Sequence, residues 1–485
     1  MAKGNSGLVM GLAVVASLGG LLFGYDTAVI SGAVAAIDHN FITPQHLSEA
    51  AASSLSGWAV SCALLGCVIG AIVGGPISTM FGRKGGLLVA AVLFFLGSIG
   101  SAWPEFGLGT IGAMGPAALT PFIVYRIIGG IGVGMASMIS PLYIAEIAPP
   151  NDRGRLVTFQ QIAIVTGILL VYFVNYFIAS QGTDAWILST GWRYMLASEA
   201  IPAALFFLLM LTAPDTPRWF VLKGQDAKAL AILRRITDEQ TAQATLKDIE
   251  GTLVVRTRPL LSFGALVLFV GVMLSVFQQF IGINAVLYYA PLMFKNMGAS
   301  TNSSFLQTVV VGIAMLVFTL VALVTVDRWG RKPLLVTGAA IMAVSMFAIG
   351  FLFNGVPHAG GDTLAMTPEV SRLALFAVVA YIAGFSLSWG PVVWVLLSEI
   401  FPNSIKGTAM AIAVAAQWIA NLFVSWSFKV MDSSSALNAA YNHGFAYWIY
   451  GAMSVLAALF VLRYVPETKQ RSLEAIEGMW GKKPV

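Results

Sequence analysis

Runs of about twenty or more apolar residues recur along the whole chain, and they limit most strongly what the chain can fold into. A hydrocarbon layer ~30 Å thick is crossed by about 20 helical residues, whereas the strands of a transmembrane barrel alternate over segments of ~10 residues. Hydrophobic residues make up 58% of the 485 residues and charged residues only 10%, which is too little charge for a soluble surface. We therefore predict an all-α integral membrane protein.

The apolar runs predict twelve membrane-spanning helices, six in each half of the chain. The expected spans are Leu8–Ile37, Trp58–Met80, Gly86–Trp103, Pro121–Ile144, Leu156–Ile178 and Arg193–Thr212, followed by Phe263–Phe294, Phe305–Thr325, Leu334–Phe353, Leu373–Leu397, Thr408–Phe428 and Phe445–Val465. The first span is too long for a cleaved signal peptide, so we expect it to be retained.

The one long charged stretch, Pro214–Pro259, separates the two sets of spans. Within it, "DAKALAILRRI" and "ATLKDIEGTL" are typical of short amphipathic helices on a membrane surface. We predict an N-terminal six-helix bundle at residues 1–213, a linker at 214–262, a C-terminal six-helix bundle at 263–465 and a tail at 466–485.

The basic residues gather on one side of this predicted arrangement. Most of the 27 lysine and arginine residues fall in the linker, in the two terminal segments and in alternate loops. The positive-inside rule assigns that side to the cytoplasm, together with both termini. The net charge of +5 therefore reflects topology, and we expect no nucleic-acid partner.

Three motifs occur once in each half at nearly constant spacing. The sequence "GRK" at Gly82 returns at Gly330, the glutamate of "AEI" at Glu146 returns at Glu399, and "PDTPR" at Pro214 returns as "PETKQR". Parallel six-helix repeats are typical of transporters that bind their substrate near the bilayer midplane, between the halves.

The sequence contains no pattern for a metal centre or an enzyme. The two cysteines, Cys62 and Cys67, lie in one apolar run, and the four histidines form no ligand motif. We find no arrangement of nucleophile and base, so we expect no catalytic activity, no metal and no cofactor.

Seven motifs together resemble the sugar porters of the major facilitator superfamily along nearly the whole chain. They are "GYDTAVISG", "YRIIGGIGVG", "PDTPRW", "QQFIGINAVLYYAP", "DRWGRKP", "AAQWIAN" and "PETK". Within that family the chain is most similar to bacterial proton–xylose symporters and next to bacterial glucose facilitators. The resemblance implies the twelve-helix major facilitator fold, a bacterial inner membrane, transport of a neutral monosaccharide, and a functional monomer.

Three charged residues, Asp26, Arg126 and Glu199, fall inside apolar runs. A charge at the bilayer centre costs about 3 kcal/mol on insertion scales, so such residues normally face a cavity and pair. Two interpretations remain open: a static ion pair that joins helices, or a proton relay in which Asp26 binds the proton. The resemblance to proton-coupled sugar porters at Asp26 and Arg126 favours the relay, although some bacterial facilitators also keep the aspartate.

Amide and aromatic side chains make up most of the remaining polar groups inside the spans. An amide offers both a donor and an acceptor, which suits sugar hydroxyls, while the alternative is that these amides only hold helices together. The resemblance implies that the sugar contacts are Gln161, Gln278, Gln279, Asn284, Gly390, Trp394, Gln417 and Trp418. We expect Gly282 to break its helix and Gly390–Pro391 to bend another.

Met315 departs from the family pattern, which has an asparagine at this position. A thioether cannot replace the donor of an amide, so we expect a shifted sugar preference or weaker binding.

Charged residues at the cytoplasmic ends of helices in both halves are candidates for a gate that closes the cytoplasmic mouth in the outward-facing state. They are Arg83, Glu146, Arg153, Asp327, Arg331, Glu399 and Lys406. Ordinary topology signals are the alternative explanation. Two family signatures are imperfect here, since "STMFGRK" lacks the usual acid before its glycine and "PETKQ" ends in Gln470 instead of glycine.

We therefore predict proton-coupled monosaccharide symport by alternating access. The nearest alternative is facilitated diffusion of the same sugar. A sugar receptor that does not transport is more remote, because only a short tail follows the last span.

Overall fold

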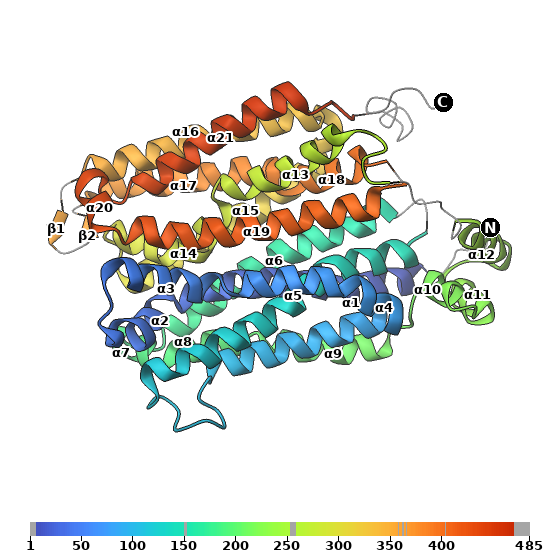
Figure 1. The fold of residues 1–485 in the computed structure, drawn as a ribbon, viewed down its shortest axis with the longest axis horizontal. Helices are drawn as coiled ribbons and strands as arrows, with labels where there is room; N and C mark the ends of the chain where they lie inside the picture. Colours follow the sequence, from blue (N-terminus) through green and yellow to red (C-terminus); the bar gives the residue numbers. More distant parts are fainter. Residues whose placement is uncertain are drawn as a thin grey trace.

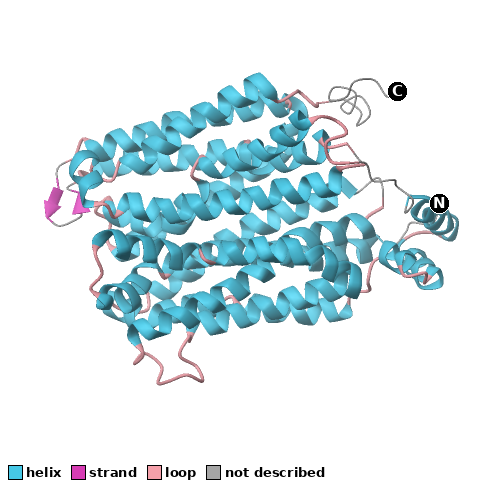
Figure 2. Cartoon of the chain, in the orientation of Figure 1, coloured by secondary structure: helices cyan, strands magenta, loops and turns pink. Residues whose placement is uncertain are grey.

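The computed structural model describes residues 6–149, 153–252, 259–356, 358–360, 363–364, 366–402 and 404–469, and they are almost entirely helical (Figures 1 and 2). The first half contains α1 (Ser6–Val29), η1 (Ile30–Gly32), α2 (Val34–Ile37), η2 (Asp38–Ile42), η3 (Thr43–Gln45), α3 (Glu49–Ser61), α4 (Ala63–Ala102), η4 (Gly115–Ala118), α5 (Leu119–Ile147), α6 (Arg153–Ala179), α7 (Asp184–Trp186), η5 (Ile187–Gly191), α8 (Trp192–Ala197) and α9 (Ala200–Thr212).

The linker forms α10 (Pro217–Leu222), α11 (Asp226–Ile236) and α12 (Glu239–Thr252). The second half contains α13 (Ala265–Phe280), α14 (Ile283–Asn296), α15 (Thr301–Trp329), α16 (Arg331–Asn354), β1 (His358–Gly360), β2 (Thr363–Leu364), α17 (Pro368–Leu387), α18 (Trp389–Ile400), α19 (Lys406–Asp432), α20 (Ser435–Tyr441) and α21 (Phe445–Tyr464). The two strands pair as a small antiparallel hairpin.

The described residues contain eleven helical segments that are long and apolar enough to cross a membrane. One of them, Glu49–Ala102, has 54 residues and would extend for about 80 Å at 1.5 Å per residue. Gly82 interrupts it with φ 89° and ψ 166°, a backbone conformation that only glycine adopts readily. This segment therefore crosses twice, and the predicted twelve-span, all-α membrane fold is confirmed.

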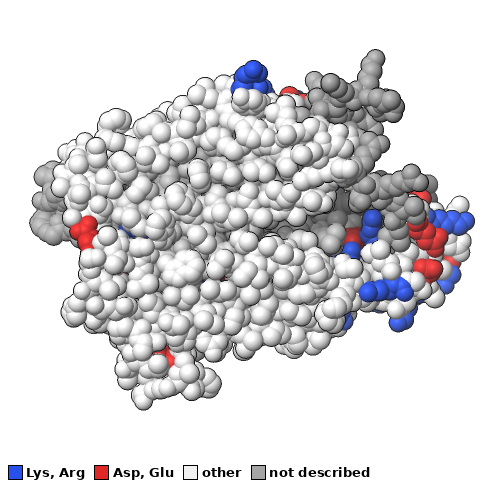
Figure 3. All heavy atoms as spheres, in the orientation of Figure 1, with Lys and Arg blue, Asp and Glu red and all other residues white. Residues whose placement is uncertain are grey.

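The helices form two bundles, with α1–α9 in the lower part of Figure 1 and α13–α21 in the upper part. The linker helices α10, α11 and α12 lie beyond one end of the bundles, which we call the linker end. The loops that contain residues 103–114 and β1–β2 lie at the opposite end, the distal end. Exposed acidic and basic side chains cluster over the linker helices (Figure 3).

Five expected spans are broken inside the structure. The predicted break of Phe263–Phe294 at Gly282 is confirmed, with φ 93° at that residue. The predicted bend at Gly390–Pro391 lies slightly earlier, at Ser388, because proline is tolerated in the first turn of α18, where the N–H groups have no helical partner.

The other three breaks were not expected, and the first of them divides Trp58–Met80 between α3 and α4 at Cys62. Leu8–Ile37 is not one continuous helix, since η1 separates α1 from α2, and Arg193–Thr212 is divided between α8 and α9 at Ser198–Glu199. Apolar content alone does not report such breaks, because a kinked span is as hydrophobic as a straight one.

Close contact between α4 and α5 depends on glycine. A Cβ atom at Gly130 would lie 1.9 Å from the carbonyl oxygen of Ala63, and one at Gly66 would lie 2.2 Å from that of Ile127. Small residues let membrane helices approach to backbone contact. This packing holds the helix that carries Arg126 against the helices beside it.

Candidate functional site

Asp26 on α1 and Arg126 on α5 form a buried ion pair inside the first bundle. The Arg126 Nη1 atom donates to Asp26 Oδ1 at 2.8 Å, and the two side chains are 5% and 6% exposed. Glu199 lies in the break between α8 and α9, is 2% exposed, and interacts electrostatically with both residues. The structure therefore brings together the three residues proposed for proton coupling.

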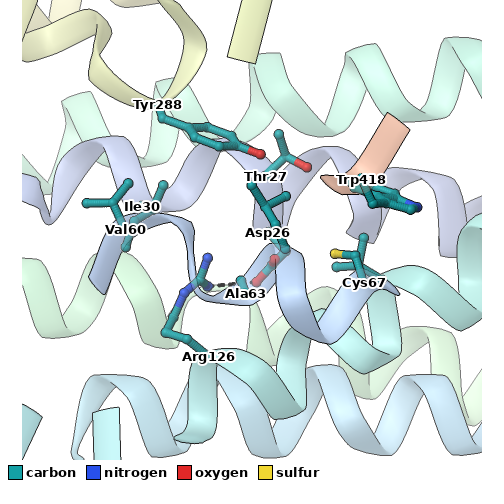
Figure 4. Close-up of a pocket in the computed structure, with 11 residues that line it drawn as sticks. Asp26, Thr27, Ile30, Val60, Ala63, Cys67, Arg126, Tyr288 and Trp418 are labelled. Carbon is teal, nitrogen blue, oxygen red and sulfur yellow. Dashed lines mark hydrogen bonds and ion pairs between the residues drawn. The ribbon is translucent and has the colours of Figure 1, made fainter. Parts of the chain in front are cut away.

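A small cavity adjoins the Asp26 carboxylate (Figure 4). Its volume is about 10 Å³, enough for roughly one water molecule. The first bundle contributes Asp26, Arg126 and Cys67, while Tyr288 and Trp418 come from the second. The ionisable pair is thus in contact with a space that both halves enclose.

Three predicted sugar-binding side chains form one hydrogen-bonded chain around the break at Gly282. Asn284 Nδ2 donates to Gln279 Oε1 at 2.5 Å, and Gln279 Nε2 lies 3.4 Å from Gln278 Oε1. Gln278 Nε2 in turn donates to the carbonyl oxygen of Trp389 at 2.8 Å and lies 3.4 Å from that of Gly390. The amides therefore join the broken helix α13–α14 to the broken helix α17–α18.

Helix α19 presents two further predicted contacts with unsatisfied polar atoms. Gln417 Oε1 and Trp418 Nε1 are buried and have no protein hydrogen-bond partner in the described structure. Buried polar atoms normally find a partner, so these two atoms are available to bind a polar group. The Trp418 ring packs on Phe23 of the first half, with ring centroids 5.4 Å apart.

The remaining predicted sugar contacts lie on the helices expected for them. Gln161 on α6 and Trp394 on α18 are partly exposed. Met315 on α15 is 5% exposed.

Tyr288 was not among the predicted site residues, although it is a polar residue in the same apolar run. Its hydroxyl accepts a hydrogen bond from Asn421 Nδ2 at 3.4 Å, and its ring lines the cavity beside Asp26. It lies on α14, six residues beyond the Gly282 break. The orientation of α14 after the break brings Tyr288 to the ion pair, and the sequence does not reveal that orientation.

The predicted gate residues form matching clusters at the linker end of each half. In the first half, Arg83 makes a two-bond contact with Glu146, with both distances 2.9 Å, and Thr216 Oγ1 donates to the same carboxylate at 2.5 Å. In the second half, Arg331 donates to Glu399 at 2.9 Å, and Thr468 Oγ1 donates at 2.6 Å. The internal repeat is therefore visible in side-chain bonding.

An acid also caps the following helix in each cluster. Asp215 Oδ1 accepts from the Arg83 N–H at 3.0 Å, and Glu467 accepts from the N–H groups of Arg331 and Lys332. Burial raises the pKa of Asp215 above its ordinary value. Burial also acts to raise the pKa of Glu467, but the backbone N–H groups outweigh it and hold that pKa below its ordinary value.

Each of these clusters lies within its own half, and neither joins the two halves. Their role in closing the cytoplasmic mouth therefore stays a prediction, which concerns the conformation that is closed at the linker end. Lys406 begins α19 and interacts electrostatically with Glu399. The side chains of Arg153 and Asp327 lie outside the part of the chain whose side chains are described.

The two halves are instead tied together at the distal end, by contacts that the sequence analysis did not identify. Lys429 Nζ on α19 lies 2.9 Å from Asp38 Oδ2, and Asp38 also accepts a hydrogen bond from Ser56. Nearby, Trp426 Nε1 donates to the carbonyl oxygen of Ser54 at 3.2 Å. These contacts close the surface between the halves at the distal end.

Replacing Lys429 by methionine should weaken this closure. The Lys429 and Asp38 side chains are 10% and 27% exposed, so solvent screens the pair and we expect a loss of about 1 kcal/mol, roughly a fivefold shift in the population closed at the distal end. Hydrogen exchange at the distal ends of α3 and α19 should become faster. Lys295→Met, at the distal end of α14, is the matched control, and equal exchange in both variants would contradict a role for the pair.

Two six-helix bundles with broken helices and a buried polar site between them define a membrane transporter of the major facilitator type. The family model described as "Sugar (and other) transporter" matches residues 12–480, and the chain belongs to this sugar transporter family. It is therefore a multi-pass membrane protein.

Characterised relatives align along nearly the whole chain. The D-xylose-proton symporter of Escherichia coli is 52% identical, over 98% of this chain and 96% of its own length. The glucose facilitated diffusion protein of Zymomonas mobilis is 46% identical, over 99% and 98%. The inward open conformation of the xylose transporter from E. coli superimposes with a TM-score of 0.86 at 50% identity, and covers 97% of this chain and 100% of that chain.

Proposed function

We propose that this protein moves a neutral monosaccharide, a pentose or hexose such as D-xylose or D-glucose, together with a proton, by alternating access. The observation that carries the proposal is the contact between the Asp26–Arg126 pair and a cavity that Tyr288 and Trp418 of the other half also line. The similarity to the D-xylose-proton symporter supports the same assignment.

The proton is taken up by Asp26 on this proposal. A buried ion pair is stable only while both charges are present, since removing one charge leaves the other uncompensated. Protonation of Asp26 therefore releases Arg126 and favours a rearrangement of the helices around the cavity. Glu199 also interacts electrostatically with Arg126 and acts as its alternative partner.

The sugar binds against the amides of α13, α14 and α19. Its hydroxyls pair with Gln417 Oε1 and Trp418 Nε1 and compete for the Gln278–Gln279–Asn284 chain. Gln278 is hydrogen-bonded to Trp389 at the α17–α18 break. A sugar that binds Gln278 therefore affects the breaks of α13–α14 and of α17–α18 together. A helix break is a place where a span can bend, since backbone hydrogen bonds are already interrupted there.

We assign the linker end to the cytoplasm of a bacterial cell, with both termini on that side of the inner membrane. The support is the clustering of basic residues at that end. On this assignment the structure, which is closed at the distal end, faces inward. Residues 1–213 and 263–465 are the two bundles that rock against each other, and the transporter works as a monomer.

Purified protein in liposomes tests the proposal. An inwardly directed proton gradient, with the outside more acidic, should drive accumulation of D-xylose or D-glucose above the external concentration. A protonophore should abolish this accumulation. The similarity to a glucose facilitated diffusion protein favours a second candidate, uncoupled diffusion. In that case the sugar equilibrates, counterflow is normal and the pH gradient has no effect.

Met315→Asn should tighten binding of D-xylose or D-glucose. An added amide supplies a hydrogen bond worth about 0.5–1.5 kcal/mol, which corresponds to a roughly three- to tenfold lower Kd. Tryptophan fluorescence titration measures this, with Met80→Asn on the exposed side of α4 as the control. Unchanged affinity for both sugars would contradict the prediction.

A further inference from the structure

The segment Phe106–Ala113, between α4 and η4, exposes apolar side chains in an unusual place. All eight of its residues are exposed, and none is acidic or basic. Phe106, Leu108 and Ile111 are 76%, 65% and 52% exposed. These side chains lie in a connecting loop, where polar residues are the common choice.

The loop has a defined shape because Glu105 holds it. Arg193 donates to both Glu105 carboxylate oxygens, at 2.7 and 2.8 Å, and the pair is almost fully buried. The same carboxylate accepts from the Gly112 N–H at 3.2 Å, and the Glu105 carbonyl oxygen accepts from the N–H groups of Leu108 and Gly109. The exposed apolar residues are therefore presented by a fixed turn and not by a free chain.

The loop projects sideways from the first bundle. Figure 2 shows it extending below the helices at the distal end, across the direction in which the spans run. At its base, the rings of Trp103 and Tyr194 lie 6.4 Å apart, and Trp186 stacks on Tyr194 at 6.3 Å. Tryptophan and tyrosine gather at the level where lipid headgroups meet acyl chains.

We propose that Phe106–Ala113 lies in the membrane interface of the distal leaflet and anchors the first bundle there, with Phe106, Leu108 and Ile111 directed into the lipid. The span next to the loop also exposes apolar surface, since Tyr194 and Ile201 on α8 and α9 are 49% and 75% exposed. The glycine-rich backbone excludes deeper insertion, because hydrocarbon satisfies no N–H or C=O group. The headgroup boundary satisfies both the backbone and the apolar side chains.

Spin labels on single cysteines in proteoliposomes test this placement. Leu108→Cys carries the label, and the buried native Cys62 and Cys67 are checked by labelling the parent protein. Val344→Cys on α16, 70% exposed on a membrane-spanning helix, is the lipid reference, and Gln240→Cys on the exposed face of α12 is the water reference. The rates at which each spin label collides with oxygen, which concentrates in lipid, and with a water-soluble nickel chelate report the depth of the label in the membrane.

The label at Leu108 should favour oxygen over the chelate, with a ratio between the two references. A ratio equal to that at Gln240 would overturn the proposal, because the loop would then lie in water. Protection from both reagents would also overturn it, since a protein partner or a second copy would then cover the loop.

A second variant separates anchoring from folding. Phe106→Ser, Leu108→Ser and Ile111→Ser together leave the Glu105–Arg193 pair intact, so counterflow transport should be retained. A label at Ala113→Cys in this variant should become as accessible to the chelate as the label at Gln240. An unchanged ratio at Ala113 would show that the three apolar side chains do not hold the loop in the interface.

Discussion

Asp26→Asn should abolish uphill sugar accumulation driven by a pH gradient while leaving sugar counterflow close to the parent rate. Asparagine has nearly the shape of a protonated aspartate but cannot release or bind a proton. Its neutral amide removes the negative charge that now lies 2.8 Å from Arg126, so the variant resembles the state that follows protonation. Sugar exchange requires the binding site and the rocking motion but no cycle of protonation.

The measurement is uptake into liposomes of radiolabelled D-xylose or D-glucose, with and without a pH gradient, next to counterflow at equal pH. Asp248→Asn is the matched control, because Asp248 is an exposed acid on the linker helix α12 outside the site. It should retain uphill uptake. Uphill accumulation by Asp26→Asn would show that another group binds the proton, and Glu199 would be the first to replace next.

Gln278→Ala should produce the largest loss in sugar affinity among single replacements of the amides. Gln278 is 2% exposed, and its amide serves both as a predicted sugar contact and as the bond to the Trp389 carbonyl oxygen at 2.8 Å. In the variant a bound sugar hydroxyl would be buried without the amide as its partner, which costs about 1–3 kcal/mol. We therefore expect the Kd to rise by a factor of roughly 5 to 150.

Titration of tryptophan fluorescence with sugar measures the Kd, and counterflow measures whether the two helix breaks still move. Gln307→Ala is the control, because Gln307 bonds only locally, to Ser303 on the same helix. Gln278→Asn keeps an amide but shortens it, and should fall between the parent and Gln278→Ala. A Kd for Gln278→Ala equal to that of the Gln307 control would remove Gln278 from the sugar site.

Much of the fold is predictable because its causes are local. The twelve crossings follow from long apolar runs, and the linker helix Asp226–Ile236 has the bounds that its amphipathic pattern predicts. The break at Gly282 is also readable, since glycine is the residue that adopts φ 93° without strain. The repeat predicts that Arg83 and Arg331 have equivalent surroundings. Each of the two side chains does bind a glutamate, and the backbone N–H group of each donates to a second acid.

The membrane itself makes one long-range pairing predictable. Asp26 and Arg126 are separated by 100 positions, yet a charge inside a bilayer has few alternative partners, and the resemblance to proton-coupled sugar porters favours this pair. The same argument makes Glu199 a second candidate partner for Arg126, and the structure decides for Asp26. The argument does not reveal the break between α8 and α9, because neither Ser198 nor Glu199 carries a strong signal for one.

Other contacts depend on packing that no local pattern encodes. Gln278 has a backbone carbonyl as its partner, and any residue at position 389 would supply one. Lys429 and Asp38 lie near the ends of separate apolar runs, where charges are ordinary, so nothing in the sequence pairs them. Which end of the molecule is closed depends on such contacts. The same sequence must supply the contacts of the inward-facing and of the outward-facing conformation, so it does not say which of the two is formed.

The sequence by itself determined the number of crossings, the duplication and the kinds of polar groups inside the membrane, because hydrophobicity and backbone preference act over a few residues at a time. The tertiary structure alone decided which polar atoms are paired and which are left for a ligand, that Tyr288 faces Asp26, and that the halves meet at the distal end. Those features depend on the relative rotation and tilt of helices far apart in the chain, which is set by the packing of whole side-chain surfaces.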